Sequence, residues 1–457
     1  MKYLQSPYFN KNETLTELFE IFFNQIKKTN GDIIESNIVW ATLFPNKPYD
    51  DKRMRKLNSV LLKEFENYLA QKVFDSDVFL KNNMTLRAIR EKKLVKLYKS
   101  TVSATNRKLE NTFNKSTEYL YAKYYNEKEK MDLYSESELL RKRSKNIENE
   151  VNISTITNYL DQFYIAEKLK YLVKLQSWKK NFNLKQDIDH KDMMHHMIKS
   201  GLYDNNPPII IYYTIWKTHL EPDNLDNYYK LKQQVEEYIE CFPNDEIRSI
   251  YDSLLSFSVR RVNKGDLSFQ KETLDIYKEA LKKEVLFLDG HITATTFNNI
   301  VFFALRTNQY DWADDFIKDY GPLLSHQDRL NSVSLSKARV EFYRKNYGQV
   351  IDLLQQVEME SVVYNLSAKT LLLSSYYELD EFDALDSFLN SFRVYINREK
   401  SISLRKKSLY KKLLSIVKKI IRLLPNDKAA INALILEIEE SPGIIIKPWL
   451  LEKLREK

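Results

Sequence analysis

Three stretches in the C-terminal half of the chain share one pattern: Asn308-Gln-Tyr-Asp-Trp-Ala-Asp-Asp-Phe-Ile317, Lys345-Asn-Tyr-Gly-Gln-Val-Ile-Asp-Leu-Leu354 and Asp380-Glu-Phe-Asp-Ala-Leu-Asp-Ser-Phe-Leu389. Their aromatic residues Tyr310, Tyr347 and Phe382 are 37 and 35 positions apart, which is the spacing of stacked helical hairpins. The pattern predicts an array of helical repeats. Such an array is a surface that holds a partner, and the repeat itself rarely encodes which partner.

The composition also predicts helices. Of 457 residues only 7 are glycine and 11 are proline, and folds rich in sheets and tight turns need more of both. No proline lies between Pro48 and Pro207, and no glycine between Gly31 and Gly201, so this segment lacks the two strongest helix breakers. We therefore expect an all-α protein with long helices in this middle segment.

Cysteine content and net charge indicate the cellular compartment and the classes of partner that the sequence allows. Cys241 is the only cysteine, which excludes an intramolecular disulfide and fits a reducing compartment. The N-terminus has no apolar core of the signal-peptide type, and no window approaches a membrane-spanning length. We expect a cytoplasmic protein. The 71 basic and 63 acidic residues give a net charge of only +8, so nucleic acid is a possible partner that charge alone does not favour.

The chain reads as three parts. Residues 1–75 predict a three-helix module with helices near 14–28, 33–43 and 51–71, and residues 76–205 predict long amphipathic helices. Residues 206–457 predict the repeat array, closed by an apolar C-terminal cap over 444–451. In the helix over 51–71 we expect these side chains to point inward: Met54, Leu57, Val60, Leu61, Phe65, Tyr68 and Leu69.

The repeat array resembles a known superfamily. In each stretch a large aromatic is followed three positions later by Ala313, Val350 or Leu385, which is similar to the start of the second helix of a tetratricopeptide repeat. The resemblance covers residues 208–425 and implies a right-handed α-α superhelix. Thr296-Phe-Asn-Asn-Ile-Val301 also resembles one pentatricopeptide repeat, a class that reads single-stranded RNA. The whole chain resembles large helical-repeat proteins of Bacteroidota-type bacteria, a likeness that implies no activity.

The segment from Ile38 to Leu69 resembles the winged helix of bacterial transcriptional activators that also carry a tetratricopeptide-like domain. The resemblance implies a recognition helix over 51–71, with four basic residues and one asparagine near phosphates or bases: Lys52, Arg53, Arg55, Lys56 and Asn58. A wing of two strands would follow this helix, but residues 75–99 contain no glycine and read as helix. The alternative is a helical hairpin that docks on the array.

The strongest local charge lies over residues 398–422, where ten Lys or Arg residues accompany one acid. On a helix these candidate contact residues form a stripe: Arg405, Lys411, Lys412, Lys418, Lys419 and Arg422. The opposite face would bury Leu409, Leu413, Ile416, Ile420 and Leu424. The stripe is interpreted as a solvated face, as a docking site for an acidic protein, or as a contact for nucleic acid or anionic lipid.

No motif indicates an enzyme or a cofactor. Glycine-rich phosphate loops, nucleophile elbows and paired cysteines do not occur. The one cluster that resembles a metal site has a spacing that matches no established site, so it reads as exposed polar residues: Asp187, Asp189, His190, Asp192, His195 and His196. We expect a non-enzymatic scaffold that binds a protein or peptide, with aromatic anchors among Tyr212, Tyr213, Trp216, Tyr228 and Tyr229. The alternative is a DNA-binding regulator with a repeat-based sensor domain.

Overall fold

The structure is a computed structural model that describes residues 1–29, 35–111, 115–136, 151–182, 184–189, 191–201, 203–355, 361–424, 427–441 and 443–457. Helices dominate these residues, and a two-stranded hairpin is the only sheet among them. The predicted all-α class is confirmed, and the handedness of the array stays a prediction. The chain divides into two compact units, Met1–Pro243 and Asn244–Lys457.

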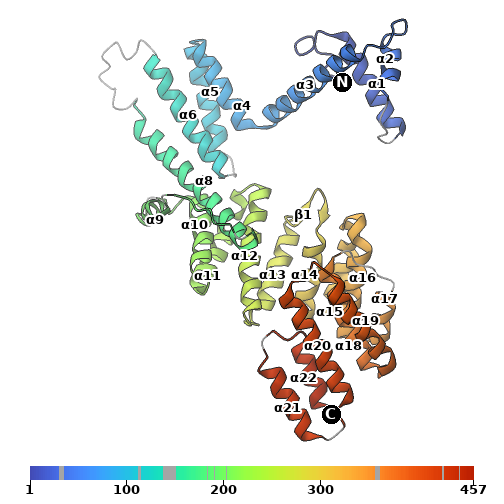
Figure 1. The fold of residues 1–457 in the computed structure, drawn as a ribbon. Helices are drawn as coiled ribbons and strands as arrows, with labels where there is room; N and C mark the ends of the chain where they lie inside the picture. Colours follow the sequence, from blue (N-terminus) through green and yellow to red (C-terminus); the bar gives the residue numbers. More distant parts are fainter. Residues whose placement is uncertain are drawn as a thin grey trace. The chain divides into compact units, whose positions relative to one another are not determined.

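The first unit, blue to green in Figure 1, contains α1 (Glu13–Thr29), α2 (Ser36–Leu43), α3 (Asp51–Ser76), α4 (Val78–Glu91), α5 (Val95–Glu110), α6 (Thr117–Glu136), α8 (Ile153–Phe182), α9 (Lys191–Lys199), α10 (Pro207–Leu220), α11 (Leu225–Tyr238) and the 3-10 helix η2 (Ile239–Cys241). Its middle helices are long, as predicted, and α8 spans 30 residues. Because α8 packs against both α6 and α10, the helices on either side of residue 205 belong to one packed unit.

The three predicted N-terminal helices are present as α1, α2 and α3. The Asp50 side chain accepts a hydrogen bond of 2.9 Å from the Arg53 backbone N–H, which caps α3. The core between the three helices contains Trp40 and Met54, and the side chains of α3 that pack on it end at Leu61. The prediction was therefore wrong for the inward residues farthest along α3: Phe65 is 50% exposed and Leu69 is 46% exposed.

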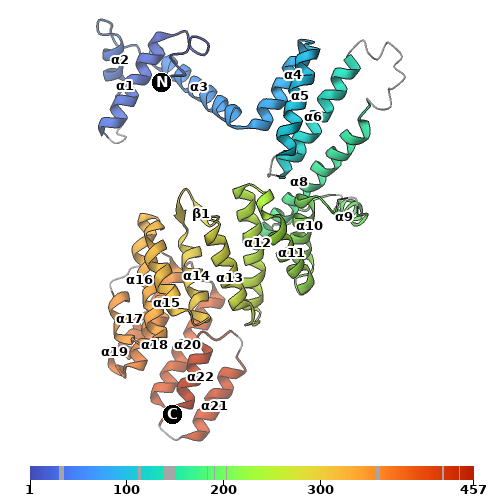
Figure 2. The same cartoon turned by 180° about the vertical axis from the view of Figure 1, so that it is seen from behind.

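The second unit contains α12 (Asn244–Asn263), α13 (Phe269–Lys282), β1 (Phe287–Leu288), β2 (His291–Ile292), α14 (Ala294–Arg306), α15 (Tyr310–Tyr320), the 3-10 helix η3 (Gly321–Leu323), α16 (His326–Tyr343), α17 (Tyr347–Leu354), α18 (Val362–Glu378), α19 (Phe382–Arg398), α20 (Leu404–Arg422), α21 (Lys428–Glu439) and α22 (Lys447–Arg455). Successive helices from α12 to α20 form hairpins that stack on one another (Figure 2). Strands β1 and β2 pair in antiparallel fashion, with Phe287 opposite Ile292.

The three sequence stretches begin at equivalent turns. Asn308, Lys345 and Asp380 have φ values of 58°, 65° and 56°, in the left-handed region. In each case the next backbone N–H bonds to a carbonyl five positions back, at 2.9, 2.9 and 3.1 Å. This left-handed C-terminal cap ends the first helix of the hairpin. The second helix then starts at the aromatic residue two positions after the left-handed one.

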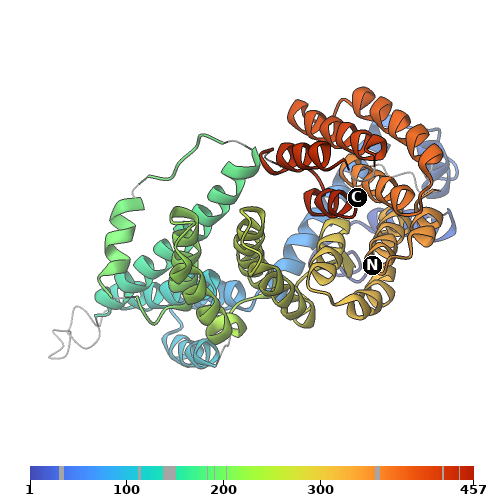
Figure 3. The ribbon, with the colours of Figure 1, turned by 90° about the horizontal axis from the view of Figure 1, so that it is seen from below.

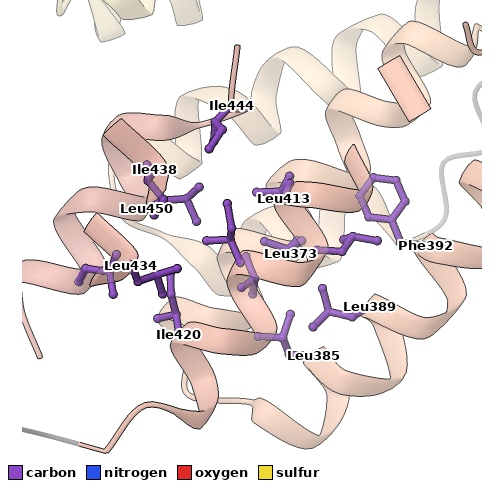
Figure 4. Close-up of a cluster of buried hydrophobic side chains, with 14 of the residues drawn as sticks. Leu373, Leu385, Leu389, Phe392, Leu413, Ile420, Leu434, Ile438, Ile444 and Leu450 are labelled. Atoms are coloured by element: carbon purple, nitrogen blue, oxygen red, sulfur yellow. The ribbon is translucent and has the colours of Figure 1, made fainter. Parts of the chain in front are cut away.

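The side chains three positions after the aromatic residues are fully buried in all three second helices. Ala313, Val350 and Leu385 are each 0% exposed, so the position picked out by the sequence pattern is a core position. In the last hairpins the core continues through α20 and α21 into α22 (Figure 4). Figure 3 shows the red C-terminal helices beside the orange-red ones.

The apolar C-terminal segment packs as predicted. Ile444 and Leu450 belong to the same buried cluster as Leu413. The prediction for Leu424 was wrong, because α20 ends at Arg422 and Leu424 is 73% exposed.

Candidate functional site

Arg339, on α16 of the second unit, is a charged residue whose hydrogen-bond partners are neutral side chains. Its Nη2 donates to Ser367 Oγ of α18 at 2.9 Å, and its Nη1 donates to Asn298 Oδ1 of α14 at 3.5 Å. Helices α14, α16 and α18 are the first helices of three successive hairpins, and α16 packs against both of the others. The half-buried guanidinium therefore links the first helices of three successive hairpins.

Burial dominates the electrostatics at this point. It lowers the pKa of the Arg339 guanidinium to about 10, while Tyr364 and Tyr343 act in the opposite direction. Both hydrogen-bond partners are neutral, and no carboxylate pairs with Arg339 among the residues that the structure describes. A guanidinium that is removed from water without a counterion carries a free-energy cost. A carboxylate or phosphate that bound here would offset that cost through charge-assisted hydrogen bonds.

Neutral polar groups surround the guanidinium. Asn298 is 3% exposed, and its Oδ1 accepts a hydrogen bond from Ser336 Oγ at 3.4 Å as well as the one from Arg339. The Tyr364 hydroxyl donates to Thr295 Oγ1 at 3.4 Å, which joins α18 to α14. The Arg339 guanidinium thus lies among amide and hydroxyl groups, an arrangement suited to binding an anion rather than to proton transfer.

Sequence reasoning missed Arg339, although a signal was present. Ser332, Ser336, Arg339 and Tyr343 follow one another at helical spacing. Ser332 and Ser336 are 3% and 0% exposed, so this stripe of α16 faces protein. A charged residue within a stripe of small polar residues was the available indication of a buried polar face.

Three residues of the predicted basic stripe on α20 have partners inside the fold. Lys418 Nζ lies 3.3 Å from Asp386 Oδ1 of α19, and Lys419 Nζ lies 2.7 Å from Glu437 Oε2 of α21. Lys412 donates a hydrogen bond to a serine hydroxyl that follows α21. The carboxylates of Asp386 and Glu437 offset the charges of Lys418 and Lys419, whereas Lys412 keeps its charge beside a neutral hydroxyl.

The other three stripe residues are exposed. Arg405, Lys411 and Arg422 have no ion pair within the described part of the chain. The helical spacing places Lys411 and Arg422 close in angle around α20, three turns apart along it, while Arg405 lies farther round. Two of the six stripe residues, Lys418 and Lys419, are therefore ion-paired within the fold.

The four basic residues of α3 are all exposed. Arg55 pairs with Asp51 one turn earlier at 2.6 Å. The Arg53 guanidinium lies over the rings of Phe44 and Trp40, with its Cζ 4.7 and 5.9 Å from the ring centroids. Lys52 and Lys56 have no ion pair among the described residues. Helix α4 occupies the place in the sequence where a wing would follow, as residues 75–99 indicated.

The histidine cluster does not converge. His195 Nδ1 lies 2.8 Å from the Tyr213 hydroxyl, and its ring packs on Trp216. Asp187 pairs with Lys179 at 3.5 Å. His190 lies outside the described residues, and no group of three possible metal ligands forms within the described ones.

The five proposed aromatic anchors differ in exposure. Tyr212, Trp216 and Tyr228 are buried at 1%, 3% and 0% exposure, so they are core residues. Tyr213 is half-buried against His195. Tyr229 is 54% exposed and is the one of the five that is open to a partner.

Comparisons with protein-family models, with curated proteins and with solved structures find no match to this chain. Within the described residues, no helix has both the length and the apolar character needed to cross a membrane.

Proposed function

We propose that this protein is a non-enzymatic scaffold whose helical repeats bind a protein or peptide partner, and that Arg339 anchors an acidic group of that partner. The observation that carries the proposal is the Arg339 guanidinium, which is desolvated among neutral hydrogen-bond partners on a face shared by three repeats. A preformed face of this kind loses little conformational entropy on binding. An acidic side chain or a terminal carboxylate would supply the missing countercharge in bidentate geometry.

The test uses tagged full-length protein to capture partners from its native cell, with and without nuclease. We expect stoichiometric proteins that survive nuclease, that are lost with Arg339→Gln and that are retained with Lys337→Gln. Lys337 is the matched control because it is exposed on the same helix. Recovery dominated by nuclease-sensitive material would contradict the proposal and favour a nucleic-acid-binding function.

The stability of the Arg339→Gln variant distinguishes a binding role of Arg339 from a structural one. Glutamine keeps a hydrogen-bonding side chain at position 339 and removes the charge, so the anchoring role predicts that Arg339→Gln changes the urea midpoint little. If the two hydrogen bonds of Arg339 mainly hold α14, α16 and α18 together, Arg339→Gln should instead lower the midpoint, because Asn298 and Ser367 would lose their partner. A clear fall in the midpoint would therefore argue against the anchoring role.

A further inference from the structure

The first unit contains a pocket of about 320 Å³ whose walls come from α4, α6 and α8. Helix α6 packs against both of the other helices, so the three walls belong to one packed group. The volume is at the lower end of the range for pockets that hold small organic ligands, roughly 300 to 1,000 Å³. A ligand of this pocket would therefore be compact.

Aromatic rings form much of the pocket wall: Phe79, Tyr121, Tyr125 and Phe163. The centroid of the Tyr121 ring lies 5.2 Å from that of Phe163 and 6.1 Å from that of Tyr125. Elsewhere on α8 a cation of the chain covers such a ring, because Lys168 Nζ lies 5.0 Å from the centroid of Tyr164. Within the described part of the chain, no lysine or arginine lies over the four pocket rings. Since the face of an aromatic ring attracts cations, these rings can bind a cation from outside the chain.

Negative charge collects at the same pocket. Three carboxylates and no basic residue line it: Asp77, Glu118 and Glu167. Two cations lie nearby. Lys170 Nζ is 3.8 Å from Glu118 Oε1, and Arg87, which is near the Tyr125 side of the pocket, pairs with Glu91 at 2.9 Å. Glu167 has no ion pair among the described residues. The lining thus keeps an excess of negative charge.

Asn83 of α4 adds a polar group without a partner. It is 3% exposed and lines the pocket, and its amide forms no hydrogen bond with any residue that the structure describes. Protein covers Asn126 Oδ1 of α6 completely, whereas the Asn83 amide remains accessible. A buried amide without a partner is costly, and an N–H group of a ligand would satisfy its oxygen.

The cation that fits these groups is organic. No group of three possible metal ligands forms within the described residues, so a metal ion would lack a set of ligands here. An organic ammonium ion needs no such set, because ring faces and a nearby carboxylate stabilise it. Its apolar part also suits the aromatic wall.

We propose that this pocket binds a small organic ammonium ion that has at least one N–H group. The ion would lie against the rings of Tyr121 and Phe163, and its N–H group would donate to the Asn83 amide oxygen. Glu167 would supply the countercharge. The site is independent of Arg339 and of the scaffold function, because it lies within the other compact unit.

The probe is para-fluorophenethylammonium, whose fluorine NMR signal reports binding to the full chain. Titration should give saturable binding of one molecule per chain. Two relatives of the probe test its chemistry on the unaltered protein. The alcohol para-fluorophenethanol has no charge and should bind more than tenfold more weakly. The N,N,N-trimethyl form keeps the charge but has no N–H group, and it should bind about threefold more weakly.

Variants of the lining locate the site. Glu167→Gln should weaken binding of the probe about tenfold, since it removes the countercharge. Tyr121→Leu should weaken it about fivefold, the loss of one cation–π contact. The matched controls are Asp161→Asn, which also removes a negative charge from α8, and Tyr164→Leu, because Tyr164 is 40% exposed and Tyr121 is 42% exposed. Neither control residue lines the pocket. Circular dichroism of each variant checks that the helices remain.

Four results would overturn the proposal. The first is an alcohol that binds as tightly as the ammonium probe, because apolar contact alone would then explain binding. The second is a trimethylated probe that binds equally well, which would remove the requirement for an N–H group. The third is a loss of affinity that is no larger for the lining variants than for their controls, because the probe would then lie elsewhere. The fourth is displacement of the probe by acetyl-Gly-Lys-Gly-amide at a lower concentration than by n-butylammonium, because a lysine of a protein partner would then be the better occupant.

Discussion

Lys453 Nζ and Glu378 Oε2 lie 3.0 Å apart across 75 positions of sequence. Their side chains are only 8% and 13% exposed. Glu378 also accepts a hydrogen bond from the Trp449 indole, so two side chains of α22 converge on one carboxylate of α18. This relationship fixes the C-terminal helix on α18 and makes Glu378 a stability determinant.

We predict that Glu378→Gln destabilises the protein by about 2 kcal/mol, less than the full cost of breaking a buried ion pair, because Glu456 remains beside Lys453 at 2.8 Å. Urea unfolding followed by circular dichroism measures the change. Glu452→Gln is the control, since Glu452 lies 3.8 Å from Lys453 and is 58% exposed, and we expect an effect below about 0.5 kcal/mol. Equal effects of the two variants would contradict a special role for Glu378.

The same lysine predicts a dependence on pH. Burial lowers the pKa of Lys453, but its hydrogen bonds to Glu456 and Glu378 outweigh burial, so the pKa lies above its ordinary value. A raised lysine pKa contributes stability that is complete below the unfolded pKa of about 10.4 and is lost as the pH rises through the folded value. The wild-type urea midpoint should therefore fall more steeply above about pH 10.4 than that of Lys453→Met. Parallel pH profiles would contradict this.

Two positions of the third sequence stretch, both on α19, should contribute differently to the free energy of unfolding. Leu385 is 0% exposed and Phe382 is 40% exposed, both on α19. Leu385→Ala should cost about 2 to 4 kcal/mol, because it removes buried methyl groups and leaves a cavity. Phe382→Ala should cost less than about 1.5 kcal/mol, since it loses mainly a partly exposed ring contact with Tyr377. Urea unfolding ranks the two, and the reverse order would show that the aromatic residue, not position 385, holds the hairpin together.

The sequence pattern located core positions of the helical hairpins but not the residues around Arg339. Leu385 could be placed because helical periodicity is local, and burial follows from it. Arg339 could not be placed, because its partners Asn298 and Ser367 lie 41 and 28 positions away. Which charges are enclosed depends on how the helices stack, and single-sequence periodicity does not contain that information.

The basic stripe on α20 illustrates the same limit. Lys418 and Lys419 were expected on an exposed stripe, and Asp386 and Glu437 from the neighbouring helices pair with them. The left-handed conformation of the hairpin turns could not be predicted for a different reason. Lys345 adopts a left-handed conformation at φ 65° without the glycine that usually signals such a cap.

The left-handed conformation of Lys345 can be tested by placing glycine there and at Lys337, because the two substitutions should change stability in opposite directions. Glycine adopts positive φ without the strain that an L side chain has there. Lys345→Gly should therefore stabilise the protein by about 0.5 to 1 kcal/mol. Lys337→Gly, at an exposed position inside α16, should destabilise it by about 1 kcal/mol. Urea midpoints measure both, and a loss of stability at both positions would mean that residue 345 is not held in the left-handed region.

The two arginines of α3 separate a structural from a DNA-binding role. The Arg53 guanidinium lies over Phe44 at 4.7 Å, so Arg53→Ala should lower the stability of the N-terminal module by about 0.5 to 1 kcal/mol. The Arg55 pair with Asp51 has side chains 79% and 52% exposed, and Arg55→Ala should change stability by less than about 0.5 kcal/mol.

A recognition helix predicts a different pattern, in which each arginine contributes to a salt-dependent affinity for duplex DNA. Anisotropy of a labelled random-sequence duplex at several salt concentrations measures this. Affinity that falls steeply with salt, and that both variants weaken to a similar extent, would overturn the structural assignment and identify α3 as a DNA-contacting helix.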